Sequence, residues 1–519
     1  MPLKTCREEE MNMQITVYEG NKKHQLTFEE GETILTVLQK AGIESITAPC
    51  GGKGTCRKCS VNVLVNGSVL TCLACTTPAE DGMVVDLIPE VRLSFAERSD
   101  GEICPPEPGQ TGYAVACDIG TTAIICQLLD LSEGKLLSRI SGSNSQRIFG
   151  GDVLSRLVSA EEGHSEEIHE QVIAQVNEFL EQLCKKSGIS PAEIKKLSVT
   201  GNTIMMHFFA GLNPAEISTA PFTPVSLFGE TKSSKELGLG FDGEVYLCPA
   251  ASGFIGSDLL CGILSGGMAA SEEDMLLVDL GTNTEMVIGS REGMIACAVD
   301  GGAAFKASLL EHGMSASAGA IGSVRVEDGD LVLNVLGNTA PKGICGSGFI
   351  DILGILYEEE ILDEMGHIAE ADETDSPLAK YIGEEDGRTV FYLTEEKNIY
   401  ISQVDISKFQ LAKAAISAGL TILAQEQKTS FEKVSALVLG GGFGTFAHRR
   451  NAALLGVIPK ECKGKTRKLG NIALAGAISA AFSEEARKEL ERLQKCIRVI
   501  DLPTHPSFND AYTDGMLFE

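Results

Sequence analysis

The sequence predicts a multidomain protein in which a small α+β domain precedes a larger, internally duplicated α/β domain. The chain has 519 residues, which is more than one hydrophobic core usually holds. Short alternating strands fill the first part of the chain, whereas long apolar strands alternate with helices after residue 112. Two similar strand-turn-strand segments, "AVACDIGTTAIIC" from Ala114 and "MLLVDLGTNTEMVIG" from Met275, indicate the duplication.

The change of pattern along the chain sets the expected domain boundaries. We expect a first domain over residues 1–90, of which about the first 12 form a tail. Residues 91–111 lack a hydrophobic period and contain Pro105, Pro106 and Pro108, so they are expected to form a linker. The second domain then covers residues 112–519, with lobes at about 112–270 and 271–519.

In the first domain the expected order is strand, strand, helix, cysteine loop, hairpin and final strand. Residues 13–18 and 25–28 alternate as a hairpin, and residues 33–43 have helical spacing. "CSVNVLVNGSVLTC" predicts two strands joined at Asn66-Gly67, and "MVVDLIP" predicts the last strand. In the second domain, two long helices are expected at Ser165 to about Ser187, before Gly188, and at Lys408 to about Gln427.

Composition restricts the environment and the partners. The chain has 72 acidic and 43 basic residues and a formal charge of −29, which argues against a nucleic-acid partner. The start "MPLKTCREEE" is polar, and no apolar run approaches the roughly 20 residues of a membrane helix. We therefore expect a cytoplasmic protein without a membrane partner. Most of the 16 cysteines stand singly in apolar segments and are expected to be reduced and buried; they include Cys117, Cys126, Cys248, Cys261, Cys297 and Cys345.

The stretch "APCGGKGTCRKC" groups Cys50, Cys56 and Cys59 with the spacing C-x5-C-x2-C, and Cys72 or Cys75 could supply a fourth thiolate. A zinc site usually uses two C-x2-C pairs, and only one is present in this stretch. The intervening glycines allow the backbone to curl around an inorganic cluster and direct N–H groups at its sulfurs. An iron–sulfur cluster is therefore favoured over zinc or structural thiols.

The two similar segments each place an Asp at the end of a strand, before a turn of Gly and hydroxyl or amide residues. Such hairpins bind phosphate through backbone N–H groups, and the carboxylate can hold hydrated Mg2+. The predicted phosphate and Mg2+ residues are Asp118, Gly120, Thr121 and Thr122 on one side and Asp279, Gly281, Thr282 and Asn283 on the other. A third element, "VSALVLGGGFGTF", is a buried strand followed by Gly440, Gly441 and Gly442, where a nucleoside could approach the backbone; a helix is expected from Arg449.

Both regions resemble known families. The cysteine loop resembles that of 2Fe-2S ferredoxins, whose β-grasp fold has the same coarse order of elements, and by that resemblance "LACTTPAEDGMVVDL" assigns Cys75 as the fourth ligand, with Cys72 as the alternative. The two hairpins and the glycine strand resemble the phosphate and adenosine motifs of the superfamily of acetate and sugar kinases, chaperone ATPases and actin, which has a ribonuclease H-like fold.

The whole chain resembles the ATP-dependent reductive activators of corrinoid proteins. The resemblance rests on "TGNTIMMHFFAGLNP", "FIGSDLLCGIL", "VDLGTNTEMVIG", "GICGSGFIDILGILYEEEILD", "AKAAISAGLTILAQE", "LGGGFGTFAHRRNAALLGVIP" and "LGNIALAGAISA". It implies a 2Fe-2S cluster, ATP with Mg2+, and one-electron reduction of a corrinoid partner from Co(II) to Co(I) in a methyltransferase system. It also implies a donor such as ferredoxin or flavodoxin and a homodimer. By the same resemblance, Gly346, Ser347 and Gly348 would contribute to the adenosine site. Asp258 and Glu285 are the candidates for the carboxylate that activates water. Either could instead be a solvated residue at the end of a helix or strand.

Two departures from this family are visible. Residues 302–307 read "GAAFKA" where the family usually reads like "GPAFEG", and Thr284 stands where Gly is common. Two alternative functions remain: an activator of another low-potential enzyme such as a dehydratase, and a regulatory module in which the redox state gates a nucleotide switch.

Overall fold

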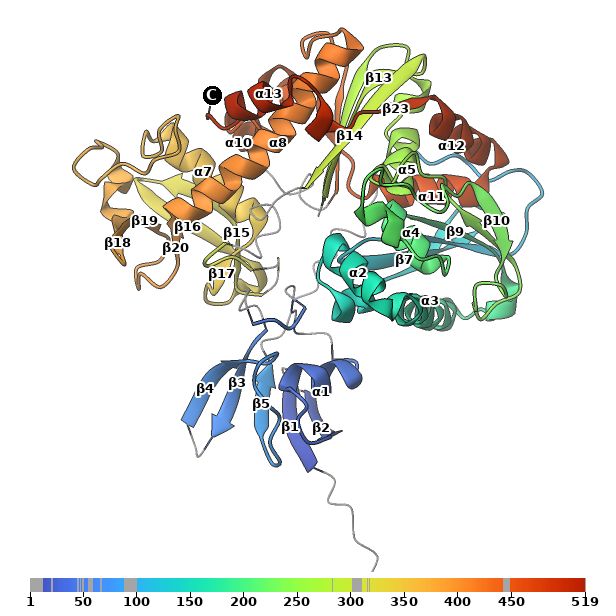
Figure 1. Ribbon diagram of the computed structural model, residues 1–519, viewed down its shortest axis with the longest axis horizontal. Helices are drawn as coiled ribbons and strands as arrows, with labels where there is room; N and C mark the ends of the chain where they lie inside the picture. Colours follow the sequence, from blue (N-terminus) through green and yellow to red (C-terminus); the bar gives the residue numbers. More distant parts are fainter. Residues whose placement is uncertain are drawn as a thin grey trace, which may run out of the picture. The chain divides into compact units, whose positions relative to one another are not determined.

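A computed structural model describes residues 13–19, 22–43, 46, 48, 51–54, 59–65, 68–87, 100–281, 283–300, 310–314, 316, 318–441 and 449–518. The chain divides into two compact units, residues 1–91 and 92–519. Figure 1 shows the elements of both units. Within the described parts of the chain, no helix combines the length and the apolar character needed to cross a bilayer.

The first unit is a five-stranded sheet with one helix, as the alternating pattern predicts. The strand order is β2-β1-β5-β3-β4, with β1 Met13–Glu19, β2 Lys22–Phe28, β3 Ser60–Val65, β4 Ser68–Leu73 and β5 Val84–Leu87. β1 pairs antiparallel with β2 and parallel with β5. Helix α1, Ile34–Lys40, begins at Thr33, whose Oγ1 accepts a hydrogen bond from the N–H of Thr36. Its apolar residues are buried with those of the strands, so the unit has its own core.

The second unit begins with a six-stranded sheet of order β10-β11-β9-β6-β7-β8. Its strands are β6 Tyr113–Ile119, β7 Ala123–Asp130, β8 Leu136–Ser143, β9 Ile194–Gly201, β10 Glu230–Ser233 and β11 Glu244–Leu247. The predicted helix, α3 Ser165–Ser187, ends at Gly188, whose φ of 70° is left-handed and favours glycine. The buried face of α3 joins the same core as β6, β7 and β9.

A second six-stranded sheet follows, with the order β22-β21-β12-β13-β14-β23. Its strands are β12 Met275–Leu280, β13 Asn283–Ser290, β14 Gly293–Asp300, β21 Leu437–Gly440, β22 Thr466–Lys468 and β23 Ile497–Val499. Both sheets contain an antiparallel three-stranded meander whose first strand pairs with a parallel strand on its other side. This agreement is what a duplication would produce, and the duplication itself stays a prediction.

Two buried helices, α5 Ser257–Ser265 and α11 Ile472–Phe482, pack against each other and lie between the two sheets (Figure 1). Their contact requires small residues. A side chain at Gly476 would collide with Cys261, and one at Gly262 would lie 2.8 Å from Ile472 Cδ1. The two glycines therefore let the helix axes approach closely.

The remaining elements complete the second lobe and the surface. Two three-stranded sheets consist of β15 Ala320–Glu327, β16 Asp330–Val335 and β17 Gly343–Ile344, and of β18 Ile382–Glu385, β19 Arg388–Tyr392 and β20 Tyr400–Ser402. The other α-helices are α2 Val153–Ser159, α4 Thr203–Phe209, α7 Gly346–Glu358, α10 Arg449–Leu454, α12 Glu484–Cys496 and α13 Phe508–Asp514. The predicted helix at Arg449 is thus present.

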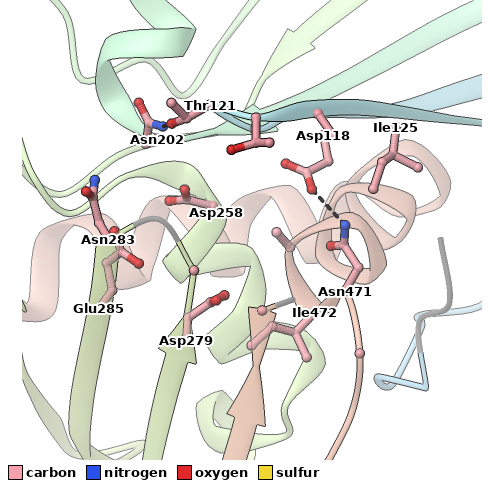
Figure 2. A pocket seen from close by; sticks show the side chains of 17 residues that line it. Asp118, Thr121, Ile125, Asn202, Asp258, Asp279, Asn283, Glu285, Asn471 and Ile472 are labelled. Atoms are coloured by element: carbon pink, nitrogen blue, oxygen red, sulfur yellow. Dashed lines mark hydrogen bonds between the residues drawn. The ribbon is translucent and has the colours of Figure 1, made fainter. Parts of the chain in front are cut away.

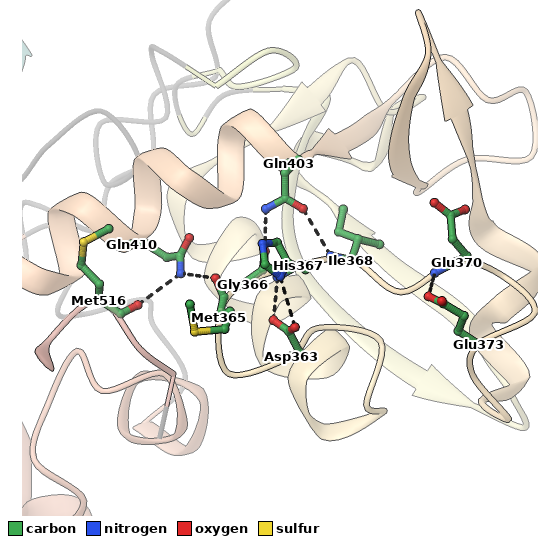
Figure 3. A network of polar contacts seen from close by, with 10 residues as sticks. All are labelled: Asp363, Met365, Gly366, His367, Ile368, Glu370, Glu373, Gln403, Gln410 and Met516. Atoms are coloured by element: carbon green, nitrogen blue, oxygen red, sulfur yellow. Dashed lines mark hydrogen bonds and ion pairs between the residues drawn. The ribbon is translucent and has the colours of Figure 1, made fainter. Parts of the chain in front are cut away.

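The predicted helix at Lys408 starts earlier than expected. Helix α8 spans Gln403–Gln427, because Ser402 and Asp405 form a capping box one turn before the apolar period begins. The added turn has a structural role (Figure 3): the side chain of Gln403 donates to Gly366 O at 2.6 Å and accepts from Ile368 N at 3.2 Å. Contacts between a helix and a loop produce no hydrophobic period in the sequence, so this first turn of α8 was not predicted.

The predicted linker region and the predicted core cysteines can both be located. Residues 100–111 belong to the second unit and hydrogen-bond to its helices, since Glu102 N donates to Ser265 O and Cys104 N donates to Ser479 Oγ. The cysteines expected in cores are all buried: Cys117, Cys126, Cys248, Cys261, Cys297 and Cys345. They behave as small hydrophobic residues.

Candidate functional site

A pocket in the second unit is lined by both predicted phosphate hairpins (Figure 2). Its described lining comprises Asp118, Gly120, Thr121, Thr122, Ala123, Ile125, Asn202, Asp258, Asp279, Gly281, Asn283, Glu285, Gly441, Gly470, Asn471, Ile472 and Ala473. Residues far apart in the sequence therefore form one site.

Four carboxyl groups reach this pocket from four elements. Asp118 and Asp279 lie near the ends of β6 and β12, Glu285 lies opposite Asp279 on β13, and Asp258 lies in the first turn of α5. In Figure 2, Asp118, Asp258 and Asp279 face a common space. Both Asp258 and Glu285 line the pocket, and Glu285 is buried, so the interpretation of Glu285 as a solvated strand end does not hold. Asp258 is half-buried at the start of α5, and the water-activating role of both residues stays a prediction.

Burial dominates the electrostatics of these carboxyl groups. It raises the pKa of Asp118 and of Asp279 to about 7 and that of Asp258 to about 6. The pKa of Glu285 is also raised, first by burial and then by the charges of Asp258 and Asp279. Each group thus resists ionisation in the absence of a nearby positive charge.

These residues fit a hydrated Mg2+ ion. Among the described residues, no three His, Cys, Asp or Glu side chains lie close enough to ligate a metal together. Mg2+ does not need such a cage, because it usually keeps several waters and binds one or two carboxylates together with phosphate oxygens. A divalent cation would favour the ionised carboxylates that burial disfavours.

Glycine is required at the places where the hairpins and the third element approach one another. A Cβ atom at Gly120 would lie 2.8 Å from Ala123 O, and one at Gly441, whose φ is 79°, would collide with Asp279 Oδ1. Gly281 N donates to Asn283 O at 3.0 Å, which closes the second turn. The absence of side chains at these glycines therefore allows a close approach of the backbone segments around the space where phosphates would bind.

Two asparagines of the site were missed by sequence reasoning. Asn471 donates to Asp118 Oδ2 at 2.7 Å, and Asn202 donates to Thr121 Oγ1 at 3.0 Å (Figure 2). Each also caps a buried helix, accepting from Leu474 N or from Met205 N. A usable signal was present, because "TGNTIMM" and "LGNIALA" both place Gly-Asn directly before an apolar helix.

The other residues predicted to bind the nucleotide do not line the pocket or lie outside the described residues. Gly440 ends β21, and a Cβ atom there would lie 3.2 Å from Asp279 Oδ2. Gly346, Ser347 and Gly348 start α7 and are buried, but they do not line the pocket, so their nucleoside role stays a prediction. Thr282, Gly442 and the segment 302–307 lie outside the described residues.

The cluster loop is described in part. Cys50 and Cys56 lie outside the described residues, whereas Cys59 and Cys75 are buried. The loop glycines have left-handed backbones, with a φ of 79° at Gly52 and 72° at Gly54. A Cβ atom at Gly52 would lie 3.9 Å from Cys75 Cβ. Cys75 therefore lies beside the glycine loop, as a ligand would. Cys72 instead pairs with Val61 and packs against the core.

Comparison with known protein families finds two matches to one family in the second unit. Residues 113–271 match the RACo middle region, and residues 273–519 match the C-terminal domain of RACo, described as the ASKHA domain. The chain belongs to the RACo family. Ahead of the RACo regions, residues 16–87 match a 2Fe-2S iron–sulfur cluster binding domain. The predicted cofactors, a 2Fe-2S cluster and ATP with Mg2+, are confirmed by the cluster-binding and ASKHA domains of this RACo family member.

Full-length relatives agree with the domain matches. The chain is 29% identical to "Corrinoid activation enzyme RamQ" of Eubacterium limosum, over 90% of this chain and 93% of the relative. It is 24% identical to a "[Co(II) methylated amine-specific corrinoid protein] reductase" of Methanosarcina barkeri, over 78% of each. The solved structure of a "Reductive activator for corrinoid,iron-sulfur protein" is similar with a TM-score of 0.69 and 26% identity, over 98% of both chains.

Proposed function

We propose that this protein reduces the cobalt of a corrinoid protein from Co(II) to Co(I) in an ATP-dependent reaction that serves a methyltransferase or demethylase system. The observation that carries the proposal is the combination in one chain of a cluster-binding unit with a pocket built from two phosphate hairpins. The names of the relatives, a corrinoid activation enzyme, a corrinoid protein reductase and a reductive activator, support the same activity.

The pocket residues account for the nucleotide part of the reaction. Backbone N–H groups of the two hairpins other than that of Gly281, which donates to Asn283 O, would bind the phosphates, and Asp118 and Asp279 would hold the waters of Mg2+. Asp258 and Glu285 are the proposed groups that orient or deprotonate the attacking water, because both line the pocket and have raised pKa values. Hydrolysis then converts ATP and water to ADP and phosphate.

The first unit accounts for the redox part. The bound 2Fe-2S cluster supplies one-electron transfer. Cys59 and Cys75, with Cys50 and Cys56, are the proposed thiolate ligands, and the glycines beside Cys75 allow the backbone to approach the sulfurs. One electron enters from a low-potential donor and one leaves to Co(II), so the protein ends each cycle unchanged.

Nucleotide is needed because this transfer is uphill. A plant-type 2Fe-2S centre has a potential near roughly −400 mV, and corrinoid Co(II) is generally harder to reduce. ATP binding or hydrolysis can drive the transfer by favouring one conformation of the complex with the corrinoid protein. Under this proposal the enzyme is an ATP-dependent oxidoreductase. A ferredoxin or flavodoxin donor, a homodimeric state and a cytoplasmic location complete the proposal, on the basis of the family resemblance.

The test uses protein purified anaerobically with its cluster. We expect about two irons and two sulfides per chain and a reduced EPR signal of the 2Fe-2S type. Mixed with a corrinoid protein, Mg2+, ATP and a low-potential donor, it should convert the Co(II) absorption spectrum to that of Co(I). Light scattering after gel filtration measures the oligomeric state.

Controls separate the two halves of the proposal. Omission of ATP should abolish reduction, and Cys75→Ser should lower the iron content, whereas Cys72→Ser should retain it. Reduction that proceeds equally without ATP, or the absence of reduction with several corrinoid proteins, would refute the proposed activity. A 4Fe-4S EPR signal would instead favour the type of cluster found in dehydratase activators.

A further inference from the structure

One buried arginine lies directly behind the first phosphate hairpin. Arg156, on α2, is fully buried, and its Nη2 donates to the carbonyl oxygen of Thr121 at 2.6 Å. Its Nε donates to Gly150 O at 2.9 Å, and its Nη1 lies 3.0 Å from Met205 Sδ. The guanidinium therefore touches the hairpin from the side opposite the solvent.

In the part of the chain that the structure describes, no carboxylate forms an ion pair with this cation. Its hydrogen-bond partners are two carbonyl oxygens, an amide oxygen and a thioether sulfur, all of them neutral. Asp152, the N-cap residue of α2, uses its carboxylate to cap that helix. Its charge still raises the pKa of Arg156, whereas the charge of Arg147 lowers it. Burial lowers the pKa of Arg156 to about 9, which leaves it protonated at neutral pH. A buried, unpaired charge is costly and calls for a functional explanation.

The same network holds the neighbouring peptide groups. Asn144, also fully buried, donates through Nδ2 to Gly120 O at 2.8 Å and through its backbone N–H to Thr122 O at 2.9 Å. Three consecutive carbonyl groups of the hairpin are thus bound from behind by Asn144 and Arg156. In a planar trans peptide the N–H group points opposite to the C=O group. The N–H groups that follow these carbonyls therefore point away from the network.

The acidic lining of the pocket suggests why a cation without an ion-pair partner lies beside it. The described lining contains four carboxylic acids and no Lys or Arg. A triphosphate adds further negative charge, so the site needs positive charge beyond Mg2+. Within the low-dielectric interior, a cation behind the hairpin acts on the phosphates through the polarised peptide groups and directly through its field.

We propose that Arg156 is a positioning residue of the nucleotide site, which fixes the first phosphate hairpin through the Thr121 carbonyl and has the bound polyphosphate as its counterion. The proposal rests on the proposed ATP-dependent function and assigns a role to a residue outside the pocket lining. Its consequence is specific: the contribution of Arg156 to affinity grows with the number of phosphates in the ligand.

The experiment compares the Mg2+ complexes of ATP and ADP with adenosine by calorimetric titration of the cluster-containing protein. In Arg156→Met we expect the Kd for ATP to rise about tenfold and that for ADP to rise less, because the lost attraction is electrostatic. The Kd for adenosine should stay within about twofold of its original value, because adenosine carries no phosphate. A role in folding alone would change all three affinities together or none of them.

Arg487 offers a matched control. It is buried as well, but it pairs with Glu484 at 3.6 Å and stacks over Tyr246 at 4.7 Å, away from the pocket lining. Arg487→Met should lower the melting temperature and leave all three affinities unchanged.

A second variant keeps the proposal testable if Arg156→Met does not fold. Arg156→Lys keeps the charge and loses the forked geometry. A rise of about threefold or more in the Kd for ATP, with adenosine unchanged, supports the proposal. Unchanged ATP affinity, or equal losses for ATP and adenosine, overturns it. If the unmodified protein does not bind ATP at all, the proposed function fails together with this inference.

Discussion

The two phosphate hairpins are similar in sequence and differ in how the protein holds them. Among the described residues, side chains of Asn144, Arg156, Asn202 and Asn471 hydrogen-bond to the first hairpin or to its Asp118. In the described part of the second hairpin, the turn hydrogen bond from Gly281 N to Asn283 O joins backbone atoms, and Gly441 of the third element lies close against Asp279.

The causes of the pKa shifts of Asp118 and Asp279 also differ between the two hairpins. For Asp118, burial raises the pKa and the hydrogen bond from Asn471 lowers it in part. For Asp279, burial and the charges of Asp258 and Asp118 all act upward. We infer that side chains from other segments hold the first hairpin in its binding geometry before nucleotide binds.

The largest effect is expected from removing either metal-facing carboxylate. Asp118→Asn and Asp279→Asn should each lower ATP-dependent Co(I) formation by about 10²–10³-fold, because charge stabilisation at a buried site is lost. Rates are measured from the Co(I) absorption. Asp330→Asn, an exposed residue paired with Lys380, is the control and should keep the full rate. A normal rate in Asp279→Asn would show that the second hairpin does not serve the nucleotide.

The second-largest effect is expected from removing Asn471, the residue that hydrogen-bonds to Asp118 of the first hairpin. Asn471→Ala should lower kcat about tenfold, because Asp118 loses the hydrogen bond that orients it, and should cost about 1 kcal/mol of stability as a lost helix cap. Ser402→Ala removes the cap of α8 instead and should cost similar stability without an effect on kcat. Equal kcat values for the two variants would contradict an orienting role for Asn471.

Stability should depend on pH in a direction set by the buried carboxyl groups. The pKa values of Asp118 and Asp279 are raised from 3.8 to about 7, so the folded protein binds more protons than the unfolded chain between these values. This contribution is fully present below pH 3.8 and is lost as the pH rises through 7. In EDTA, the melting temperature of Asp118→Asn relative to the unmodified protein should therefore increase from pH 5 to pH 8. Saturating Mg2+ with ATP should reduce that increase, and a difference independent of pH would contradict the assignment.

The smallest effect concerns Thr284, beside the second hairpin. Its hydroxyl is buried and has no hydrogen-bond partner among the described residues. Thr284→Val should increase the free energy of unfolding by about 1 kcal/mol, measured by urea denaturation, because an unsatisfied polar group is removed. Thr466→Val is the control and should lose about 1 kcal/mol, since Thr466 Oγ1 donates to Cys462 O. Destabilisation by Thr284→Val would indicate that this hydroxyl has a partner in the native protein.

Local hydrophobic patterns in the sequence predicted much of the fold. The period of residues 165–187 and the stop at Gly188 predicted α3, and alternation predicted the strands of the first unit. The start of α8 was misplaced because its first turn is defined by Ser402 and Gln403, whose capping and loop contacts have no period. The small sheets β15–β17 and β18–β20 were not predicted.

The sequence by itself determined the two Asp-x-Gly-Thr turns, the glycine strand and the cysteine spacing, since each is a short segment whose chemistry depends on neighbours in the chain. Only the tertiary structure decided which distant residues serve them. Asn471 meets Asp118 across 353 positions, and Arg156 meets Thr121 across 35. A hydrogen bond between such residues depends on how helices and sheets pack, and packing brings together side chains whose pairing no local pattern records.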